Sequence, residues 1–160
     1  MLKRLGYPSL EQVKSCFPQQ DVLLKPKAII ECYEAIPCNP CETSCPVHAI
    51  TIGQDINHRP QLDVDRCTGC GICIHSCPGL AICVVSLKQD QAIFKIPYEF
   101  LPLPHVSDVW HGVNRAGEVI APVKILEVRS TPIQDHTHIV TVAIDKQYLY
   151  DFITIRSPHE

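Results

Sequence analysis

Cys67-Thr68-Gly69-Cys70-Gly71-Ile72-Cys73-Ile74-His75-Ser76-Cys77-Pro78 is the stretch of sequence that decides the fold. Two residues separate neighbouring cysteines within the first three, and three residues separate the third from the fourth. Two-residue gaps let one loop wrap three thiolates around an inorganic cube, and glycines in the loop allow the backbone to come close. The chain then turns into a short helix, so the fourth cysteine points away, toward a second centre.

The same pattern occurs twice, at a constant offset of 32 residues from Cys38 to Cys70. Residues 38–50 match residues 70–82, and in each copy the last cysteine is followed by proline and then by a β-like run. An internal repeat of this kind is the signature of a structure built from similar units. The sequence therefore predicts a pseudo-twofold core made of two half-domains.

The cysteine pattern predicts two 4Fe–4S clusters. In the run C-x2-C-x2-C-x3-C-P, the fourth cysteine ligates the other cluster of the pair. The first copy is irregular, because Ala35 stands where its first cysteine is expected, and Cys32 is the nearest cysteine upstream. A ligand needs only to reach the iron, so the five-residue gap after Cys32 is tolerable. We expect cluster I to be held by Cys32, Cys38, Cys41 and Cys77, and cluster II by Cys45, Cys67, Cys70 and Cys73.

Two alternatives remain open for these residues. If Cys32 is a buried structural thiol, cluster I has three ligands and is a 3Fe–4S centre. A zinc site built from the two Cys-x2-Cys pairs at residues 38–41 and 67–70 would leave three cysteines and both Cys-Pro pairs unexplained. The remaining cysteines, Cys16 and Cys83, are expected to be small buried hydrophobic side chains.

Composition narrows the class of protein. The chain has 160 residues, of which 46% are hydrophobic, and a net charge of −3, so it offers no basic field for nucleic acid. The apolar run at residues 80–87 is too short to cross a bilayer, and the N-terminal residues lack the apolar segment of a signal peptide. We therefore expect a cytoplasmic protein. Disulfides are rare in that compartment, which favours metal binding for the ten cysteines.

The chain divides into three expected units within an α+β fold. Residues 1–30 form an N-terminal arm with a short helix after Ser9, and residues 31–88 form the two-cluster domain. Residues 97–160 form a small antiparallel β module, with strands expected near 117–128, 139–144 and 152–155. Pro97, Pro102 and Pro104 indicate a linker before that module.

Two resemblances extend this interpretation. The cysteine core resembles dicluster bacterial-type ferredoxins. Residues 30–41, together with residues 112–119 of the tail, look like small iron–sulfur subunits of flavin-dependent amine or amino-acid dehydrogenase complexes of the proline, hydroxyproline or opine type. The second resemblance implies a non-catalytic electron-transfer subunit in a hetero-oligomer. Its partners would be FAD-containing dehydrogenase subunits, which oxidise a carbon–nitrogen bond.

The residues outside the core also favour a dedicated subunit. The tail carries no cysteine but is rich in valine and isoleucine, so it must bury its surface somewhere. We expect residues 97–160 to be a docking module, with Trp110 serving either docking or packing within the tail. The alternatives are a free soluble ferredoxin and a redox-sensing or scaffold iron–sulfur protein.

The charges near the cysteines predict an order of reduction. Three acidic residues surround the first ligand loop, whereas Arg66 and His75 lie near the second. Negative charge disfavours the reduced, more anionic form of a cluster. We therefore expect cluster I to be harder to reduce than cluster II. The acidic residues are Glu31, Glu34 and Glu42.

Overall fold

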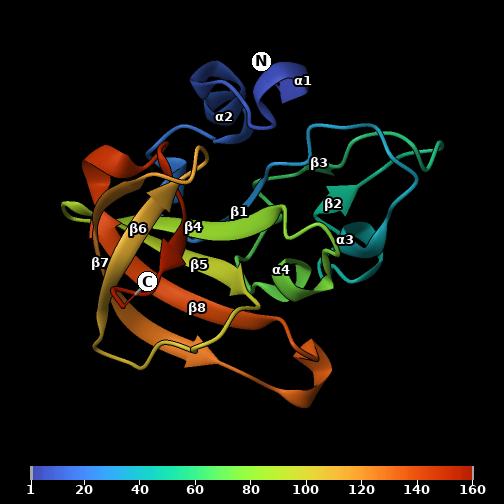
Figure 1. The fold of residues 1–160 in the computed structure, drawn as a ribbon. Helices are drawn as coiled ribbons and strands as arrows, with labels where there is room; N and C mark the ends of the chain where they lie inside the picture. Colours follow the sequence, from blue (N-terminus) through green and yellow to red (C-terminus); the bar gives the residue numbers. More distant parts are fainter. Residues whose placement is uncertain (1, 160) are drawn as a thin grey trace.

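A curled antiparallel sheet and a smaller lobe of loops and short helices make up the molecule (Figure 1). The computed structural model describes residues 2–159. The sheet has seven strands in the order β1-β4-β5-β8-β7-β6-β9, and a two-stranded ribbon pairs β2 with β3. This arrangement of mostly antiparallel sheet with few helices is compatible with the α+β class expected from the sequence.

The N-terminal arm contains short helices that lie above the sheet in Figure 1. Helix α1 spans Leu2–Leu5 and α2 spans Leu10–Cys16, followed by a 3-10 turn at Val22–Leu24. The backbone N–H of Gln12 donates to the Ser9 hydroxyl, and the Gln12 side chain accepts from the Ser9 N–H, which forms a capping box. The helix predicted after Ser9 is therefore present, and Pro18 follows it closely.

The cysteine lobe holds short elements on the right of Figure 1. Helix α3 spans Pro40–Thr43 and α4 spans Ile72–Ser76. Strand β2 spans Ile50–Thr51 and β3 spans Gln61–Leu62. The lobe is tied to the large sheet, because β1 (Lys27–Ile30) pairs with β4 (Ile82–Lys88) on either side of the cysteine loops in the sequence.

The C-terminal half supplies the rest of the large sheet. The strands expected from the sequence are all present, and β5 and β6 join them. The tail strands are β5 (Gln91–Tyr98), β6 (Val109–Asn114), β7 (Val119–Arg129), β8 (His138–Asp145) and β9 (Phe152–Arg156), with 3-10 turns at Pro132–Gln134 and Lys146–Tyr148. The sheet curls so that β9 returns over β5, where the rings of Phe94 and Phe152 lie 4.8 Å apart.

Strand β5 continues through the region that the sequence marks as a linker. Pro97 lies within β5 and is in register with Ile139 of β8. The pairing between β5 and β4 ends earlier, at Lys95 and Val84, so the missing N–H of Pro97 interrupts no ladder on that side. Strand β5 crosses residue 97, and β1, which ends at residue 30, pairs with β4 of the expected cluster domain. The large sheet therefore joins all three expected units, and the three-unit division stays a prediction.

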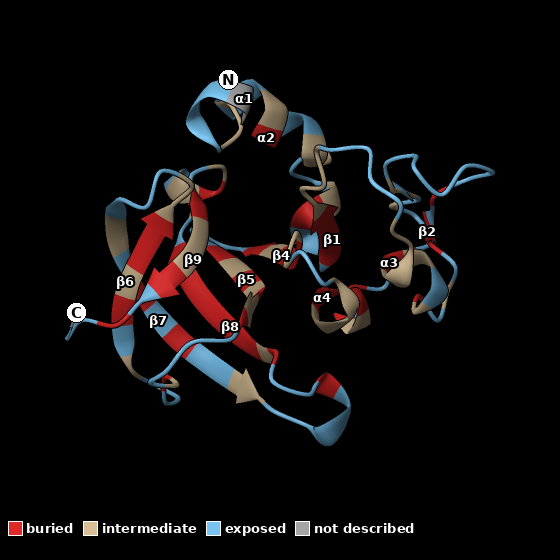
Figure 2. Ribbon diagram, turned by 45° about the vertical axis from the view of Figure 1, so that its right-hand side comes forward, coloured by how far each residue is buried: buried red, intermediate tan, exposed pale blue. Residues whose placement is uncertain are grey.

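The core consists of two clusters of buried residues, and the buried residues of the strands are red in Figure 2. The larger part fills the curled sheet, and Trp110 lies in it with 5% exposure, against the ring of Tyr98. The smaller part surrounds the cysteines and includes Ile139 of β8, which is 2% exposed. A residue of the tail therefore packs beneath the cysteine loops. No helix among residues 2–159 is long and apolar enough to cross a membrane.

Candidate iron–sulfur sites

The structure brings eight cysteines together as two sets of four, each around its own cavity. Site I is defined here as the cavity lined by Cys32, Cys38, Cys41 and Cys77. Site II is defined as the cavity lined by Cys45, Cys67, Cys70 and Cys73. These are the two sets that the sequence spacing predicts. Each site contains one cysteine from the other half of the repeat, because Cys77 reaches site I and Cys45 reaches site II.

Short helices position the thiols of site I. Cys41 lies in α3, where Pro40 starts the helix, and Cys77 follows the last residue of α4. The walls between the thiols are apolar, and Ile30, Ile52 and Ile82 are among the lining residues. Burial and the nearby Cys77 thiol raise the pKa of Cys41 to about 11, and the same two causes raise the pKa of Cys32.

The loop of site II depends on two glycines in left-handed conformations. Gly69 has φ +67° and Gly71 has φ +85°. A Cβ atom on Gly69 would lie 2.5 Å from the carbonyl oxygen of Pro26, so no larger residue fits there without moving the backbone. Burial, and after it the negative charges of the three other cysteines of site II, raise the pKa of Cys73 to about 12.

Backbone N–H groups point at the cysteine sulfurs. Ala81 donates to Cys77 Sγ at 3.4 Å in site I, and Ala49 donates to Cys45 Sγ at 3.3 Å in site II. Such N–H···S bonds stabilise the thiolate form and tune the potential of an iron–sulfur cluster. Four thiols per cavity, apolar walls and N–H donors on sulfur are together the environment that a 4Fe–4S cluster requires.

A single metal ion needs a tighter group of ligands than a cubane does. Within the described residues, no three His, Cys, Asp or Glu side chains form a group that could hold one ion. The thiols around a cubane each bind a different iron, so they stand farther apart than the ligands of one zinc ion. The spread of thiols around two cavities fits clusters better than the zinc site considered from the sequence.

The backbone hydrogen bonds and strand pairs around the cysteine loops, called the hydrogen-bond frame here, repeat at the same 32-residue offset as the cysteines. The N–H of Glu31 donates to Ala81 O at 2.8 Å, and 32 residues later the N–H of Asp63 donates to a carbonyl at 2.7 Å, that of Ala49. Strand partners follow the same offset, since Ile30 pairs with Ile82 and Leu62 pairs with Ile50. The repeat therefore extends upstream of the cysteines, into segments that the cysteine pattern alone does not mark.

An ion pair next to site I was not predicted from the sequence. Arg115, in the turn between β6 and β7, donates from Nε to Glu31 Oε2 at 2.7 Å and from Nη2 to Glu31 Oε1. Tyr33 donates to the same carboxylate at 2.9 Å, and Arg115 Nη1 donates to Tyr150 O at 2.8 Å. Burial lowers the pKa of Arg115, but Glu31 outweighs burial and raises it overall. This pair ties the residue before Cys32 to the tail.

The two cysteines outside the sites occupy apolar surroundings. Cys83 lies in β4 with 5% exposure, and Cys16 is half-buried on α2 against the large core. Burial is the main cause that raises the pKa of each thiol, so both are protonated at neutral pH. Neither lines site I or site II.

Comparison with known proteins identifies the class of the cysteine lobe. Residues 36–81 match the model of the 4Fe–4S dicluster domain. This segment is therefore similar to ferredoxin-type iron–sulfur domains, and the protein carries two 4Fe–4S clusters. The match begins after Cys32, so the fourth cysteine of site I lies outside it.

Individual relatives share the same segment. The chain is 36% identical over 58 residues to the ferredoxin-type protein NapF of Haemophilus influenzae, covering 35% of this chain and 33% of NapF. It is 38% identical over 52 residues to NapF of Escherichia coli K12, covering 31% of this chain and 32% of that protein. It is 36% identical over 53 residues to one subunit of the Na(+)-translocating ferredoxin:NAD(+) oxidoreductase complex of Acetobacterium woodii, covering 33% of this chain and 15% of that subunit.

The chain thus spans about a third or less of the length of these curated relatives. No solved structure matches it.

Proposed function

We propose that this chain is a non-catalytic electron-transfer subunit whose sites I and II each hold one 4Fe–4S cluster through their four cysteines. The observation that carries the proposal is the gathering of eight thiols around two separate cavities, four to each. When bound, each cluster supplies a centre that takes up and releases one electron. The protein's own groups provide thiolate ligands, N–H donors to sulfur, and apolar walls that limit access of water.

The two half-domains are proposed to be related by a pseudo-twofold axis. The 32-residue offset recurs in the cysteines, in strand partners and in the N–H···S bonds of Ala49 and Ala81. Two residues after their Cys-Pro pairs, His48 and Leu80 both have positive φ, 49° and 51°. A conformation that is uncommon outside glycine supports the equivalence of the two loops when it occurs at matching positions.

The partner is proposed to be an FAD-containing dehydrogenase that oxidises an amino acid or amine, in a cytoplasmic hetero-oligomer. The sequence resemblance to iron–sulfur subunits of such complexes supports this partner. A surface feature supports docking: Phe100 and Leu101 are 70% and 80% exposed. Phe100 also lines a cavity that reaches Ala81, the residue that donates to Cys77 of site I. A partner docked on this apolar surface would lie next to site I.

The docking role is best tested by surface substitution. The sequence alone suggests that a chain ending near Lys95 could keep both clusters. The tail, however, shares its sheet with β4 and packs Ile139 beneath the cysteine loops, so such a chain would lose part of the core. Replacing Phe100 or Leu101 by Asp instead changes an exposed side chain and leaves the sheet intact.

The experiment is anaerobic purification from the native cell, with metal, sulfide and flavin analysis. We expect about eight iron and eight labile sulfide per chain, as two cubanes require, and a co-eluting flavoprotein. Phe100→Asp should keep the iron content and release the flavoprotein, while the exposed Lys124→Asp serves as a control on β7. A zinc-rich preparation with little sulfide would refute the cluster assignment. A fully loaded chain without any partner would favour a free ferredoxin.

A further inference from the structure

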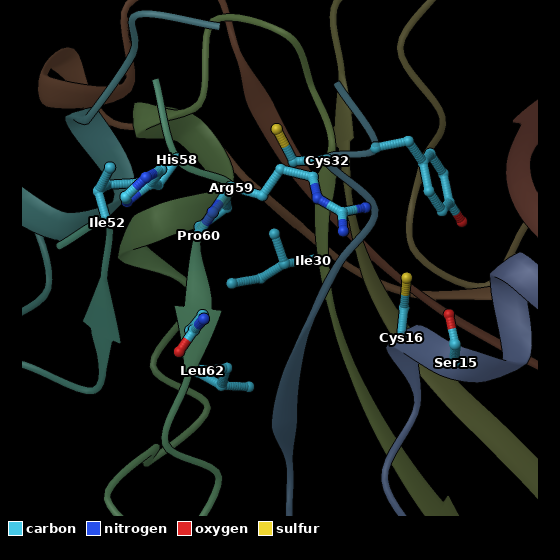
Figure 3. A pocket seen from close by; sticks show the side chains of 11 residues that line it. Ser15, Cys16, Ile30, Cys32, Ile52, His58, Arg59, Pro60 and Leu62 are labelled. Atoms are coloured by element: carbon cyan, nitrogen blue, oxygen red, sulfur yellow. The ribbon is translucent and has the colours of Figure 1, made fainter. Parts of the chain in front are cut away.

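Each half of the repeat places one cation near one cysteine, which is Cys67 at site II and Cys32 at site I. Lys27 opens β1, and its Nζ donates to the carbonyl oxygens of Val64 at 2.7 Å and Cys67 at 2.8 Å. Arg59 stands 32 residues later, at the equivalent position before β3. It lies close to Cys32 on the wall of a pocket that both residues line (Figure 3). Lys27 thus belongs to site II and Arg59 to site I.

The two cations differ in their exposure to water. Lys27 is buried, with 9% exposure, and its hydrogen bonds to the two carbonyl oxygens hold the ammonium group against the start of the site II loop. Arg59 is exposed at the surface of the cysteine lobe. A charge acts more strongly through the protein interior than through solvent, where water and salt screen it. The fixed charge at site II therefore has the larger effect on its neighbours.

The residue that follows each cation also differs between the two sites, in whether it can donate an N–H to a cysteine sulfur. The N–H of Ala28 donates to Cys67 Sγ at 3.4 Å, which gives site II a second N–H···S bond. The equivalent residue in the other half is Pro60, which has no N–H to offer. Cys32 of site I therefore cannot receive the matching bond.

Other charges near the two sites also make the surroundings of site II more positive than those of site I. The Arg129 guanidinium of β7 approaches the site II loop at Gly71. At site I the carboxylate of Glu42, next to Cys41, is half-buried and accepts the N–H of Ile52 at 3.0 Å. The negative charge of Glu31 is compensated by Arg115, so Glu31 contributes less than the sequence suggests. The acidic residues Asp63 and Asp65 near site II are exposed.

We propose that Lys27 and Ala28 at site II, against Arg59 and Pro60 at site I, poise site II at the higher reduction potential. The inference rests on the proposed cluster assignment and adds the residues that set the order. Reduction makes a cluster more negative, so a buried positive charge and an additional N–H donor stabilise the reduced form. Site II is therefore the site where an electron resides, and site I is the less easily reduced one.

The test is a potentiometric titration of the full-length, cluster-loaded protein without oxygen, followed by magnetic-resonance spectroscopy. Wild-type protein should show two centres of different potential. Lys27→Met keeps the length of the side chain and removes the charge, so it should move the higher-potential centre to a more negative value. Lys27→Arg keeps the charge and should restore most of the shift. Lys88→Met, at the exposed end of β4, is the matched control and should move neither centre.

Pro60→Ala tests the other half independently. The new N–H should move the lower-potential centre to a more positive value and leave the centre that Lys27→Met moves unchanged. If Lys27→Met does not retain its iron, Pro60→Ala alone decides, and an unshifted lower-potential centre overturns the inference.

Two further results would also overturn it. One is a Lys27→Met protein with full iron and sulfide in which the lower-potential centre moves, or neither does. The other is an equal shift in Lys88→Met. A wild-type protein with fewer than two reducible centres would instead overturn the cluster assignment, and this inference with it.

Discussion

Site I and site II share the same hydrogen-bond frame but differ in the loops that carry their cysteines. Site II has regular two-residue gaps, two left-handed glycines and buried surroundings. In site I the cysteine Cys32 is separated from Cys38 by a five-residue gap whose residues are mostly exposed. The frame is fixed by strand pairs and N–H···S bonds that recur 32 residues apart, so the loop between them can vary. The comparison teaches that the frame, more than the cysteine spacing, determines where a ligand is placed.

The two sites also differ in what the C-terminal half contributes. Beneath the cysteine loops, Ile139 packs in an apolar cluster that holds the buried cysteines of site II together with Cys41 of site I, and Arg129 approaches Gly71 of the site II loop. Next to site I, the contribution is the Arg115 ion pair with Glu31. Apolar packing tolerates small shifts, whereas a buried ion pair requires both partners in place. Site I should therefore be the more sensitive to changes in the tail.

The largest difference between the two sites should appear when one cysteine is removed from either of them. In Cys32→Ala, site I should lose its 4Fe–4S cluster or hold a 3Fe–4S centre, while site II stays intact. Cys67→Ala should do the reverse. Iron analysis with magnetic-resonance spectra measures both. Two intact cubanes in Cys32→Ala would show that Cys32 is no ligand, whereas a 3Fe–4S centre already present at site I of the unaltered protein would favour the alternative from the sequence.

Breaking the ion pair between Glu31 and Arg115 should have the second-largest effect. The side chains of Arg115 and Glu31 are 10% and 9% exposed, so Glu31→Gln leaves a buried guanidinium without its charge partner. Removing one partner of a buried pair costs about 3–5 kcal/mol of unfolding free energy. Iron should be lost from site I before site II during slow denaturation.

The double variant Glu31→Gln/Arg115→Met is the matched control, because it leaves neither charge behind. It should be more stable than Glu31→Gln alone. Equal iron loss from both sites in Glu31→Gln would contradict a specific link to site I.

The glycines of the site II loop should separate steric from conformational effects. Gly69→Ala places a Cβ atom 2.5 Å from a backbone oxygen, whereas at Gly71 the nearest atom would be 3.4 Å away, at the end of the Ile74 side chain. Gly71→Ala should cost about 1–2 kcal/mol from its left-handed backbone, and Gly69→Ala more. Thermal unfolding of the loaded protein measures both, and a Gly71→Ala protein as damaged as Gly69→Ala would contradict the ranking.

The smallest effects are expected at the cysteines outside the sites. Cys16→Ala and Cys83→Ala should keep both clusters, since neither residue lines site I or site II. Cys83→Ala removes a buried sulfur and should cost roughly 1 kcal/mol of unfolding free energy. Loss of iron in either variant would mean that the ligand sets extend beyond the eight cysteines.

Local signals in the sequence predict much of this structure. Ser9 and Gln12 cap α2, and the runs of β-branched residues become β7, β8 and β9. The cysteine spacing groups eight thiols into the two sets that line the two cavities. Each of these features depends on residues close together in the sequence, or on a repeat that can be read directly.

Long-range contacts could not be predicted in the same way. Pro97 reads locally as a break, but β5 continues through it because the ladder with β4 has already ended there. The partner of Glu31 lies 84 residues away, and nothing in the local pattern marks Arg115 for it. Lys27 is different, since extending the repeat upstream aligns it with Arg59 and could have identified both cations.

The link between Glu31 and Arg115 also bears on the order of biosynthesis. Arg115 further donates to the carbonyl oxygens of Tyr150 and Asp151, so its position depends on residues near the end of the chain. At about 5–20 residues per second, the ribosome adds the 84 residues between Glu31 and Arg115 in about 4–17 s. During that interval the segment around Cys32 is without its ion-pair partner. Both sites have their four cysteines by residue 77, so the Arg115 ion pair is the contribution that site I, unlike site II, must wait for until the tail has been made.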